Sequence, residues 1–320
     1  MAPMNDVLSD ILDTVDLRAA LYFRTDYHPP FGVAVPAFER AARFHLVAQG
    51  SCHVQLEDGT AAHVQTGDLV LVPNGSPHLV TSSPEIDAVP LEDLLTAAGF
   101  SGSGPFVIGS GPSDESCQMV CGHFTFADGA DHPMLRAVPN LLHIPAADRA
   151  EKPMLNEIVQ LIVRRAFEDE PGAHAAVSRL SEILYIELMR AGIAQAPDIS
   201  RLMSAVYDPK IGRALMLIHG DIASHWTVDK LARAVGMSRS RFANQFRELV
   251  GSGPMNYVAD WRLQRARQLL SEPGASIKAI APLVGYTSSA AFTRAFTAHF
   301  GRSPRQQRTA AQSDVALRLK

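Results

Sequence analysis

The stretch AVGMSRSRF at residues 234–242 returns as LVGYTSSAAF at residues 283–292. Each copy continues into a second phenylalanine and then a glycine and proline, with GSGP at 251–254 and GRSP at 301–304. A repeated unit of this size indicates two similar small domains in tandem. Each copy places a glycine turn between two short helical patterns, which is typical of a helix-turn-helix. Double-stranded DNA is therefore the first partner to consider.

The second helix of each copy is predicted to read the DNA. In the first copy Phe242, Phe246 and Leu249 are expected to form the buried stripe. Arg or Asn on the opposite face can bond to guanine or adenine edges, and Ala can contact a thymine methyl. The predicted DNA-binding residues are Arg239, Ser240, Arg241, Asn244 and Arg247 in the first copy, and Ser288, Ala290, Arg294, Thr297 and Arg305 in and after the second.

Local signals set the bounds of these helices. Thr227 and Ser276 are predicted N-caps of the first helices, and Ser238 and Ser288 of the second. Between the copies, residues 255–270 form an amphipathic helical pattern. A rigid helix there would hold the two reading helices about one DNA turn apart, as successive major grooves require.

Charge is divided unevenly along the chain. Residues 1–207 hold 12 Lys and Arg against 26 Asp and Glu, whereas residues 208–308 hold 15 against 6. An acidic body joined to a basic C-terminal part suits a protein that touches nucleic acid with one end. No apolar run reaches the roughly 18 residues of a membrane span, and the N-terminus lacks the pattern of a signal peptide, so we expect a cytoplasmic protein without membrane contact.

The N-terminal part has a different pattern. Short apolar strands between residues 20 and 80, separated by Gly, Pro, Asp and Asn turns, predict a small β-sandwich or barrel. Residues 81–118 are rich in Ser, Gly and Pro and are predicted to be a flexible insertion, with a helical turn or two near residues 91–98. Strands resume at 117–126, and two amphipathic helices follow within 151–200, either as core or as a dimer interface.

These patterns predict an α+β chain. We expect a small β-barrel domain at 1–150 and a helical dimerisation or linker region at 151–200. An all-α tandem helix-turn-helix domain is expected at 205–308, followed by a disordered tail at 309–320. The expected assembly is a homodimer.

The C-terminal hundred residues resemble the AraC/XylS family of transcription regulators. The resemblance is carried by the second copy, VGYTSSAAFTRAF at 284–296, and by FGRSPRQQR at 300–308. It implies a sequence-specific promoter-binding protein, usually an activator that has RNA polymerase as a partner. The residues themselves leave activator and repressor open.

The N-terminal part resembles the cupin sensor domains attached to one AraC subgroup. GDLVLVPNGSPH at 67–78 fits the second cupin motif, in which His78 is aimed into the barrel. The companion motif keeps only His45 and the closing Gly50, without the His-x-His and Glu of metal-dependent cupin enzymes. We therefore expect that the protein is not an enzyme. The alternative to a regulator is an enzyme, namely a metal-dependent cupin enzyme with a DNA-binding appendage.

Four possible metal ligands fall on or beside predicted strands: His45, His78, Cys121 and His123. Imidazole and thiolate are ligands that zinc prefers, so three or four of these side chains could converge on Zn²⁺. The alternatives are that His78 is hydrogen-bonded within the barrel and that Cys121 is a small core residue.

Two further kinds of effector stay open. An oxidant could act on Cys121, four residues from Cys117, which lies at a loop edge where exposure is possible. A small organic molecule could occupy an apolar pocket, for which the candidate lining is aromatic: Tyr22, Phe23, Tyr27, Phe31, Phe38 and Phe44.

Overall fold

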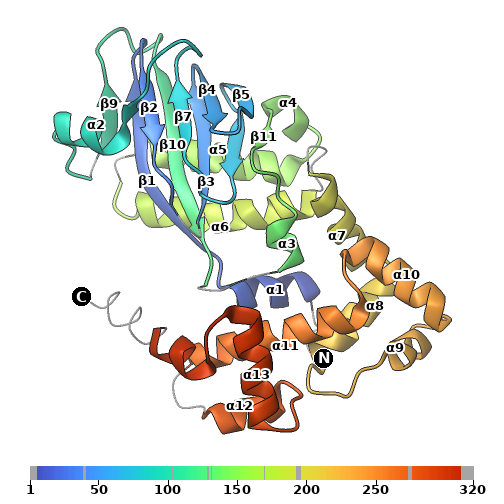
Figure 1. Ribbon diagram of the computed structural model, residues 1–320. Coiled ribbons are helices and arrows are strands. Elements are labelled where there is room, and N and C mark those ends of the chain that lie inside the picture. The colour runs from blue at the N-terminus through green and yellow to red at the C-terminus, as the bar shows by residue number, and fades with distance from the viewer. Residues whose placement is uncertain are drawn as a thin grey trace. The chain divides into compact units, whose positions relative to one another are not determined.

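A computed structural model describes residues 6–310 apart from 39–40, 103, 128–129, 131, 169, 192–195 and 273–275. Its internal contacts divide the chain into two compact units, whose elements are labelled in Figure 1. The β unit comprises residues 17–126 and 137–200. The helical unit comprises the chain up to Asp16, residues 127–136, and the chain from Arg201 onward.

The β unit is built from two sheets. The six-stranded sheet has the order β11 (Leu142–Ile144), β6 (Leu69–Val72), β3 (Ala41–Gln49), β10 (Cys117–Thr125), β1 (Arg18–Tyr27), β9 (Pro105–Ile108). The five-stranded sheet has the order β5 (Ala61–Gln65), β4 (Ser51–Leu56), β7 (His78–Thr81), β2 (Gly32–Val35), β8 (Val89–Pro90). The predicted sandwich or barrel is confirmed in this two-sheet form.

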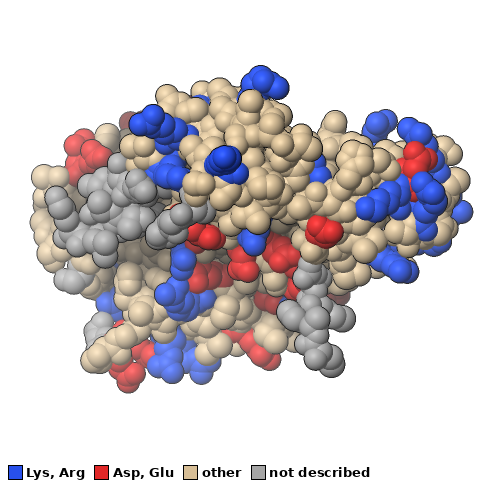
Figure 2. All heavy atoms as spheres, turned by 90° about the horizontal axis from the view of Figure 1, so that it is seen from below, with Lys and Arg blue, Asp and Glu red and all other residues tan. Residues whose placement is uncertain are grey.

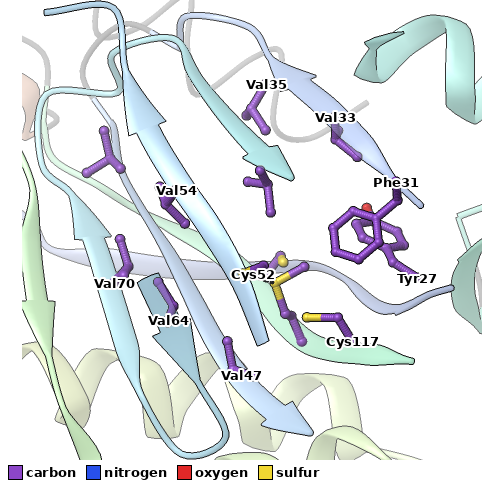
Figure 3. Packing of buried hydrophobic residues seen from close by; sticks show 14 of the residues in the cluster. Tyr27, Phe31, Val33, Val35, Val47, Cys52, Val54, Val64, Val70 and Cys117 are labelled. Atoms are coloured by element: carbon purple, nitrogen blue, oxygen red, sulfur yellow. Dashed lines mark hydrogen bonds between the residues drawn. The ribbon is translucent and has the colours of Figure 1, made fainter. Parts of the chain in front are cut away.

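The main core of the β unit contains side chains from both sheets (Figure 3). Val47 and Val70 come from the six-stranded sheet, and Val54 and Val64 come from the five-stranded one. Because side chains alternate along a strand, every second residue of β3 faces the other sheet and the intervening ones face outward. The β3 side chains that face the other sheet are therefore Arg43, His45 and Val47. They determine which chemical groups β3 contributes to the space between the sheets.

Helices cover the outer face of the six-stranded sheet (Figure 1). α5 (Pro153–Ala166) and α6 (Ala173–Ala191) pack against each other, and α6 packs on β1. The ring of Phe124, on β10, lies 5.0 Å from that of Tyr185 on α6. A short α4 (Ala146–Arg149) precedes the pair. The helical pattern of 151–200 thus has a buried apolar face, as core packing requires.

The segment 81–118 differs from the expected irregular insertion. Within it, β8 pairs with β2 and β9 pairs with β1, so the segment adds an edge strand to each sheet. Between them lies the helix α2 (Leu91–Ala97), which matches the predicted helical turns. The frequent Ser, Gly and Pro residues form the connections between these short elements, which the composition alone did not resolve.

The helical unit consists of short, capped helices. Its C-terminal part contains α8 (Ile211–Gly220), α9 (Val228–Ala234), α10 (Arg239–Val250), α11 (Pro254–Ser271), α12 (Ile277–Leu283) and α13 (Ser289–Phe300). Before it, α7 (Pro197–Tyr207) crosses the boundary between the units. No helix among the described residues is both long and apolar enough to span a membrane.

Two segments expected in the N-terminal domain belong to the helical unit instead. They contain α1 (Val7–Val15) and α3 (Pro133–Arg136). The buried face of α1 packs against α8 and α11. The predicted domain at 1–150 thus contributes residues to both units, because these two segments pack with the C-terminal helices. In the predicted tail, residues 309–310 are helical and 311–320 lie outside the described residues.

Candidate nucleic-acid interface and internal cavity

All four predicted N-caps are confirmed. The Thr227 hydroxyl accepts a hydrogen bond from the backbone N–H of Lys230, and the Ser276 hydroxyl accepts one from Ala279. Ser238 and Ser288 cap α10 and α13 in the same way. A hydroxyl cap satisfies a helix N–H that otherwise has no intrahelical partner. These local bonds therefore set where α9, α10, α12 and α13 begin.

The two helices predicted to read DNA, α10 and α13, expose the predicted face. Phe242 and Phe246 of α10 are fully buried, and Val250 completes their stripe. Leu249, expected in that stripe, is only partly buried because Val250 occupies the inward position one residue later. Every predicted DNA-binding residue is exposed: Arg239, Ser240, Arg241, Asn244, Arg247, Ser288, Ala290, Arg294, Thr297 and Arg305.

Positive side chains gather on the part of the helical unit that carries α9 and α10 (right in Figures 1 and 2). They include Arg233, Arg239, Arg241 and Arg247, all exposed. Arg239 also forms an ion pair with Asp229, with Nη1 and Oδ2 3.1 Å apart. Both side chains are exposed, so water and salt screen this pair and it leaves the arginine available to a phosphate.

Arg262 joins the two helix-turn-helix motifs. From α11, its Nη2 donates to Ser224 O over 2.8 Å and its Nε donates to Ile222 O over 3.0 Å, both before α9. The guanidinium also covers Gly285, the turn of the second motif, where a Cβ would lie 2.6 Å from Nη2. Gly285 has φ +79°, a conformation that glycine adopts without steric cost. Through this one side chain, α11 joins the loop before α9 to the turn of the second motif.

In the β unit, Cys121, His45 and His78 form a hydrogen-bonded chain. Cys121 lies opposite His45 on neighbouring strands, and their Sγ and Nδ1 are 3.2 Å apart. His45 Nε2 lies 2.8 Å from Nε2 of His78, which comes from the other sheet. His78 Nδ1 lies 2.9 Å from Ser76 O.

The partners of this chain assign its protons. A carbonyl oxygen only accepts, so His78 Nδ1 carries the hydrogen and Nε2 accepts from His45; His45 Nδ1 then accepts the Cys121 thiol hydrogen. Burial lowers the pKa of His45 well below its usual value and that of His78 to about 4, despite the hydrogen bond to Ser76. Burial raises the pKa of the Cys121 thiol. All three groups are therefore neutral near pH 7.

This arrangement does not fit a metal site. The two nitrogens of His45 point in opposite directions, so one ion cannot be bound by both Cys121 and His78 at the places they occupy. The fourth predicted ligand, His123, stacks on Tyr22 instead, with ring centroids 4.5 Å apart. Within the described residues, no group of three or more His, Cys, Asp and Glu side chains is placed to hold a metal.

The cysteines are free and buried. Cys117, for which the sequence allowed exposure, is only 1% exposed because it lies in the core between the sheets (Figure 3). Cys52 is buried beside it, and hydrogen bonding to Cys117 followed by burial raises the Cys52 pKa. Buried thiols with raised pKa values have little thiolate, which is the reactive form.

Beside the His45 chain lies a cavity of about 350 Å³. Four of the six predicted aromatic residues line it, whereas Phe31 and Phe44 do not. Phe44 faces outward because it alternates with His45 along β3. The full lining comprises Tyr22, Phe23, Tyr27, Val33, Val35, Pro36, Ala37, Phe38, Arg43, His45, Val80, Leu91, Glu92, Leu95, Met119, Cys121 and Gly122.

Arg43 is the lining residue that the sequence analysis missed. Its side chain enters the cavity from the same face of β3 as His45. An arginine within the largely apolar strand AARFHLVAQ at 41–49 was an available signal, because a charge on an inward strand position needs a partner.

Comparisons with known proteins agree with both units. A cupin family model matches residues 6–194, and a helix-turn-helix domain model matches residues 231–310. The transcriptional regulator AlkR of Acinetobacter baylyi is 32% identical over 95% of this chain and 99% of its own length. A Streptomyces antibioticus protein named as an AraC-like transcription regulator is 28% identical over 95% of this chain and 97% of its own.

The Escherichia coli protein RclR, named as an RCS-specific transcriptional activator, is 26% identical over 92% of each chain. These relatives and family models lend no support to the alternative of a cupin enzyme with a DNA-binding appendage. The matched segments cover the two-sheet domain and, apart from Thr227 and the first residues of α9, both helix-turn-helix motifs. The chain belongs to the AraC-type helix-turn-helix transcriptional regulators that carry an N-terminal cupin domain.

Proposed function

We propose that this DNA-binding regulator activates transcription, that α10 and α13 read its promoter site, and that an effector bound in the β unit controls it. Activation is supported by the name of the RclR relative, a transcriptional activator. An activator of this kind works beside RNA polymerase on the promoter, in the cytoplasm. The observation that carries the proposal is the pair of capped helices whose predicted reading faces are exposed, with positive side chains gathered around α10.

The two reading helices are chemically unequal. α10 presents Arg241, Asn244 and Arg247, which can bond to base edges and phosphates. α13 presents Ala290, Arg294 and Thr297, of which only Arg294 is charged. We therefore assign most base-specific hydrogen bonding to α10 and apolar contact plus one arginine to α13.

Effector control is supported by the continuity of two strands. β1 and β10 both line the cavity and pair with each other from Arg18↔Thr125 onward. The chain passes from the start of β1 into α1 and from the end of β10 into residues 127–136, both parts of the helical unit. A ligand that shifts the spacing of β1 and β10 would therefore act on the packing of α1, which we propose as the element that changes state in such control.

Dimerisation is supported by an apolar stripe on α5. Met154 is 58% exposed, and Leu161, seven residues later on the same face, is also exposed. Exposed apolar side chains in a row are typical of a helix that pairs with another surface. We propose that a second copy of this chain covers them. Sedimentation equilibrium would show a dimer, and a Leu161→Glu variant would shift it toward monomer.

The experiment that tests the DNA-binding proposal is selection of bound sequences from a random double-stranded DNA pool with the full chain and no added effector. We expect one enriched motif with two conserved blocks about 10–10.5 base pairs apart, because α10 and α13 would occupy successive major grooves. Enrichment of a single block would show that only one helix reads DNA. No enrichment would contradict the assignment of both helices.

A further inference from the structure

The cavity of the β unit contains a buried positive charge without a counter-charge. Arg43 is 6% exposed, and its Nε has no hydrogen-bond partner. The rings of Tyr22 and Phe38 lie 5.7 and 5.4 Å from its guanidinium carbon. Within the described part of the chain no carboxylate forms an ion pair with it. A buried guanidinium in this state costs free energy that an anion would recover.

The buried arginines Arg149 and Arg267 differ from Arg43 because their guanidinium groups donate hydrogen bonds to backbone oxygens. Arg149 donates to the backbone oxygens of Gly67 and Ile144, and Arg267 donates to that of Thr14. Each of these guanidinium groups ties two elements together and has a structural reason for its burial. For Arg43 the described residues provide only aromatic faces, which compensate a cation weakly compared with a carboxylate.

The remainder of the cavity is apolar or neutral. His45 and Cys121 satisfy each other within their hydrogen-bonded chain and are neutral near pH 7. Val33, Val35 and Met119 supply aliphatic surface. Glu92, the one carboxylate in the lining, is exposed on α2, where water screens it. The site therefore combines one positive charge with an apolar wall.

We infer that the effector is a small organic monoanion, a carboxylate on a compact aromatic or aliphatic body, with the carboxylate bound by Arg43. An arginine fork matches a carboxylate with two parallel hydrogen bonds, and desolvation strengthens such a pair. A cavity of about 350 Å³ lies at the lower end of the range for small-molecule pockets, so the body is short. This inference rests on the proposed effector control and adds the chemical class of ligand.

The test uses charged and neutral probes of equal shape on the full chain without DNA. Titration calorimetry would compare 4-tert-butylbenzoate with 4-tert-butylbenzamide, and octanoate with 1-octanol. We expect each carboxylate to bind about 10- to 100-fold more tightly than its neutral partner, because an amide or hydroxyl oxygen accepts only a weaker hydrogen bond from Arg43 and forms no ion pair. Equal affinities of the charged and neutral compound within each pair would show that the charge of the ligand plays no role. If none of the four compounds bound, the cavity would not be a site for this class of ligand.

Variants separate Arg43 from the general charge of the protein. Arg43→Gln is expected to remove the preference for carboxylates, whereas Arg24→Gln, on β1 and outside the cavity lining, is expected to keep it. Arg43→Met replaces a buried unpaired charge with an apolar side chain, so its melting temperature without ligand is expected to equal or exceed that of the parent chain. A folded Arg43→Met that still prefers carboxylates, or one that unfolds, would contradict the inference.

The ligand inference and the proposed DNA-binding function can fail independently, because separate experiments test them. Ligand binding is measured without DNA, and sequence selection is measured without ligand. If selection from the random DNA pool enriches a two-block motif but no carboxylate binds, the DNA-binding function stands and the ligand class is wrong. If carboxylates bind but leave promoter affinity unchanged, the site stands and the proposed effector control is wrong.

Discussion

Arg267 on α11 donates a hydrogen bond from Nη2 to the backbone oxygen of Thr14 over 2.8 Å, joining positions 253 residues apart. Its Nε also donates to Gln264 Oε1. The bond connects the N-terminal helix α1 to the helix between the two helix-turn-helix motifs. A segment that precedes the first strand of the cupin domain is thus part of the helical unit.

Arg267→Met should destabilise the helical unit. The substitution removes the donor for the buried Thr14 oxygen, and an unsatisfied buried acceptor costs about 1–3 kcal/mol. Urea unfolding of the full chain would measure the loss. Arg265→Met, on the same helix and only partly buried, is the matched control and should cost less. Equal effects of the two variants would show that the bond to Thr14 contributes nothing.

Alanine substitutions on the exposed face of α10 should weaken binding to the DNA site that sequence selection yields. Arg241→Ala and Asn244→Ala are each expected to cost about 1–3 kcal/mol of specific binding and to relax the preference at one or two positions. Fluorescence anisotropy at fixed salt would measure both effects. Arg213→Ala removes an exposed arginine from α8, away from the reading helices, and should leave sequence preference unchanged. Parent-like binding by both α10 variants would disprove this assignment.

Gly285→Ala should destabilise the second motif more than Gly301→Ala. Both glycines have positive φ, so each alanine carries the left-handed penalty of about 1–2 kcal/mol. At Gly285 the new Cβ would also meet the Arg262 guanidinium, which two backbone carbonyls hold in place. At Gly301 nothing lies within 4 Å. Thermal unfolding would rank the two, and a reversed order would refute the role of Arg262.

Acid should destabilise the β unit through the half-buried His123. Burial, followed by the positive charge of Arg43, lowers the pKa of His123 to about 4, compared with about 6.5 in an unfolded chain. Between these values the unfolded state binds a proton that the folded state does not. Stability is therefore retained above pH 6.5 and is lost as the pH falls toward 4.

His123→Phe keeps the stacking on Tyr22 and removes this titration, so the slope of unfolding free energy against pH should fall by about one proton at most. The control is His63→Phe, an exposed position on β5 that stacks on His53. Urea unfolding at pH 7, 6, 5 and 4.5 gives the slopes. If the His123 variant kept the parent slope, the ring would not be neutral in the folded protein.

Metal analysis checks the zinc prediction. Because the Cys121–His45–His78 chain satisfies its members without an ion, we expect protein purified without chelators to contain far less than one zinc per chain. One zinc per chain, lost in both His78→Ala and Cys121→Ala, would instead show that these side chains rearrange around a metal. Elemental analysis by mass spectrometry distinguishes the two results.

The sequence by itself determined the features that depend on neighbouring residues. Ser238 and Ser288 cap their helices by bonds spanning three residues, and the spacing of Phe242 and Phe246 orients α10. The strand positions of His45 and Cys121 were likewise visible, as was the aim of His78 into the barrel. These rules act over one or two turns or a few strand residues, so they can be read from the chain.

Only the tertiary structure decided how distant positions meet. Strand pairing put Cys121 opposite His45, while the packing of the two sheets brought His78 to the other nitrogen of that ring, giving a hydrogen-bonded chain in place of a cluster around one point. It also left Arg43 facing an apolar cavity and brought Thr14 to Arg267. Such contacts join residues 30 or more positions apart, and their geometry depends on the packing of whole sheets and helices, which local spacing does not encode.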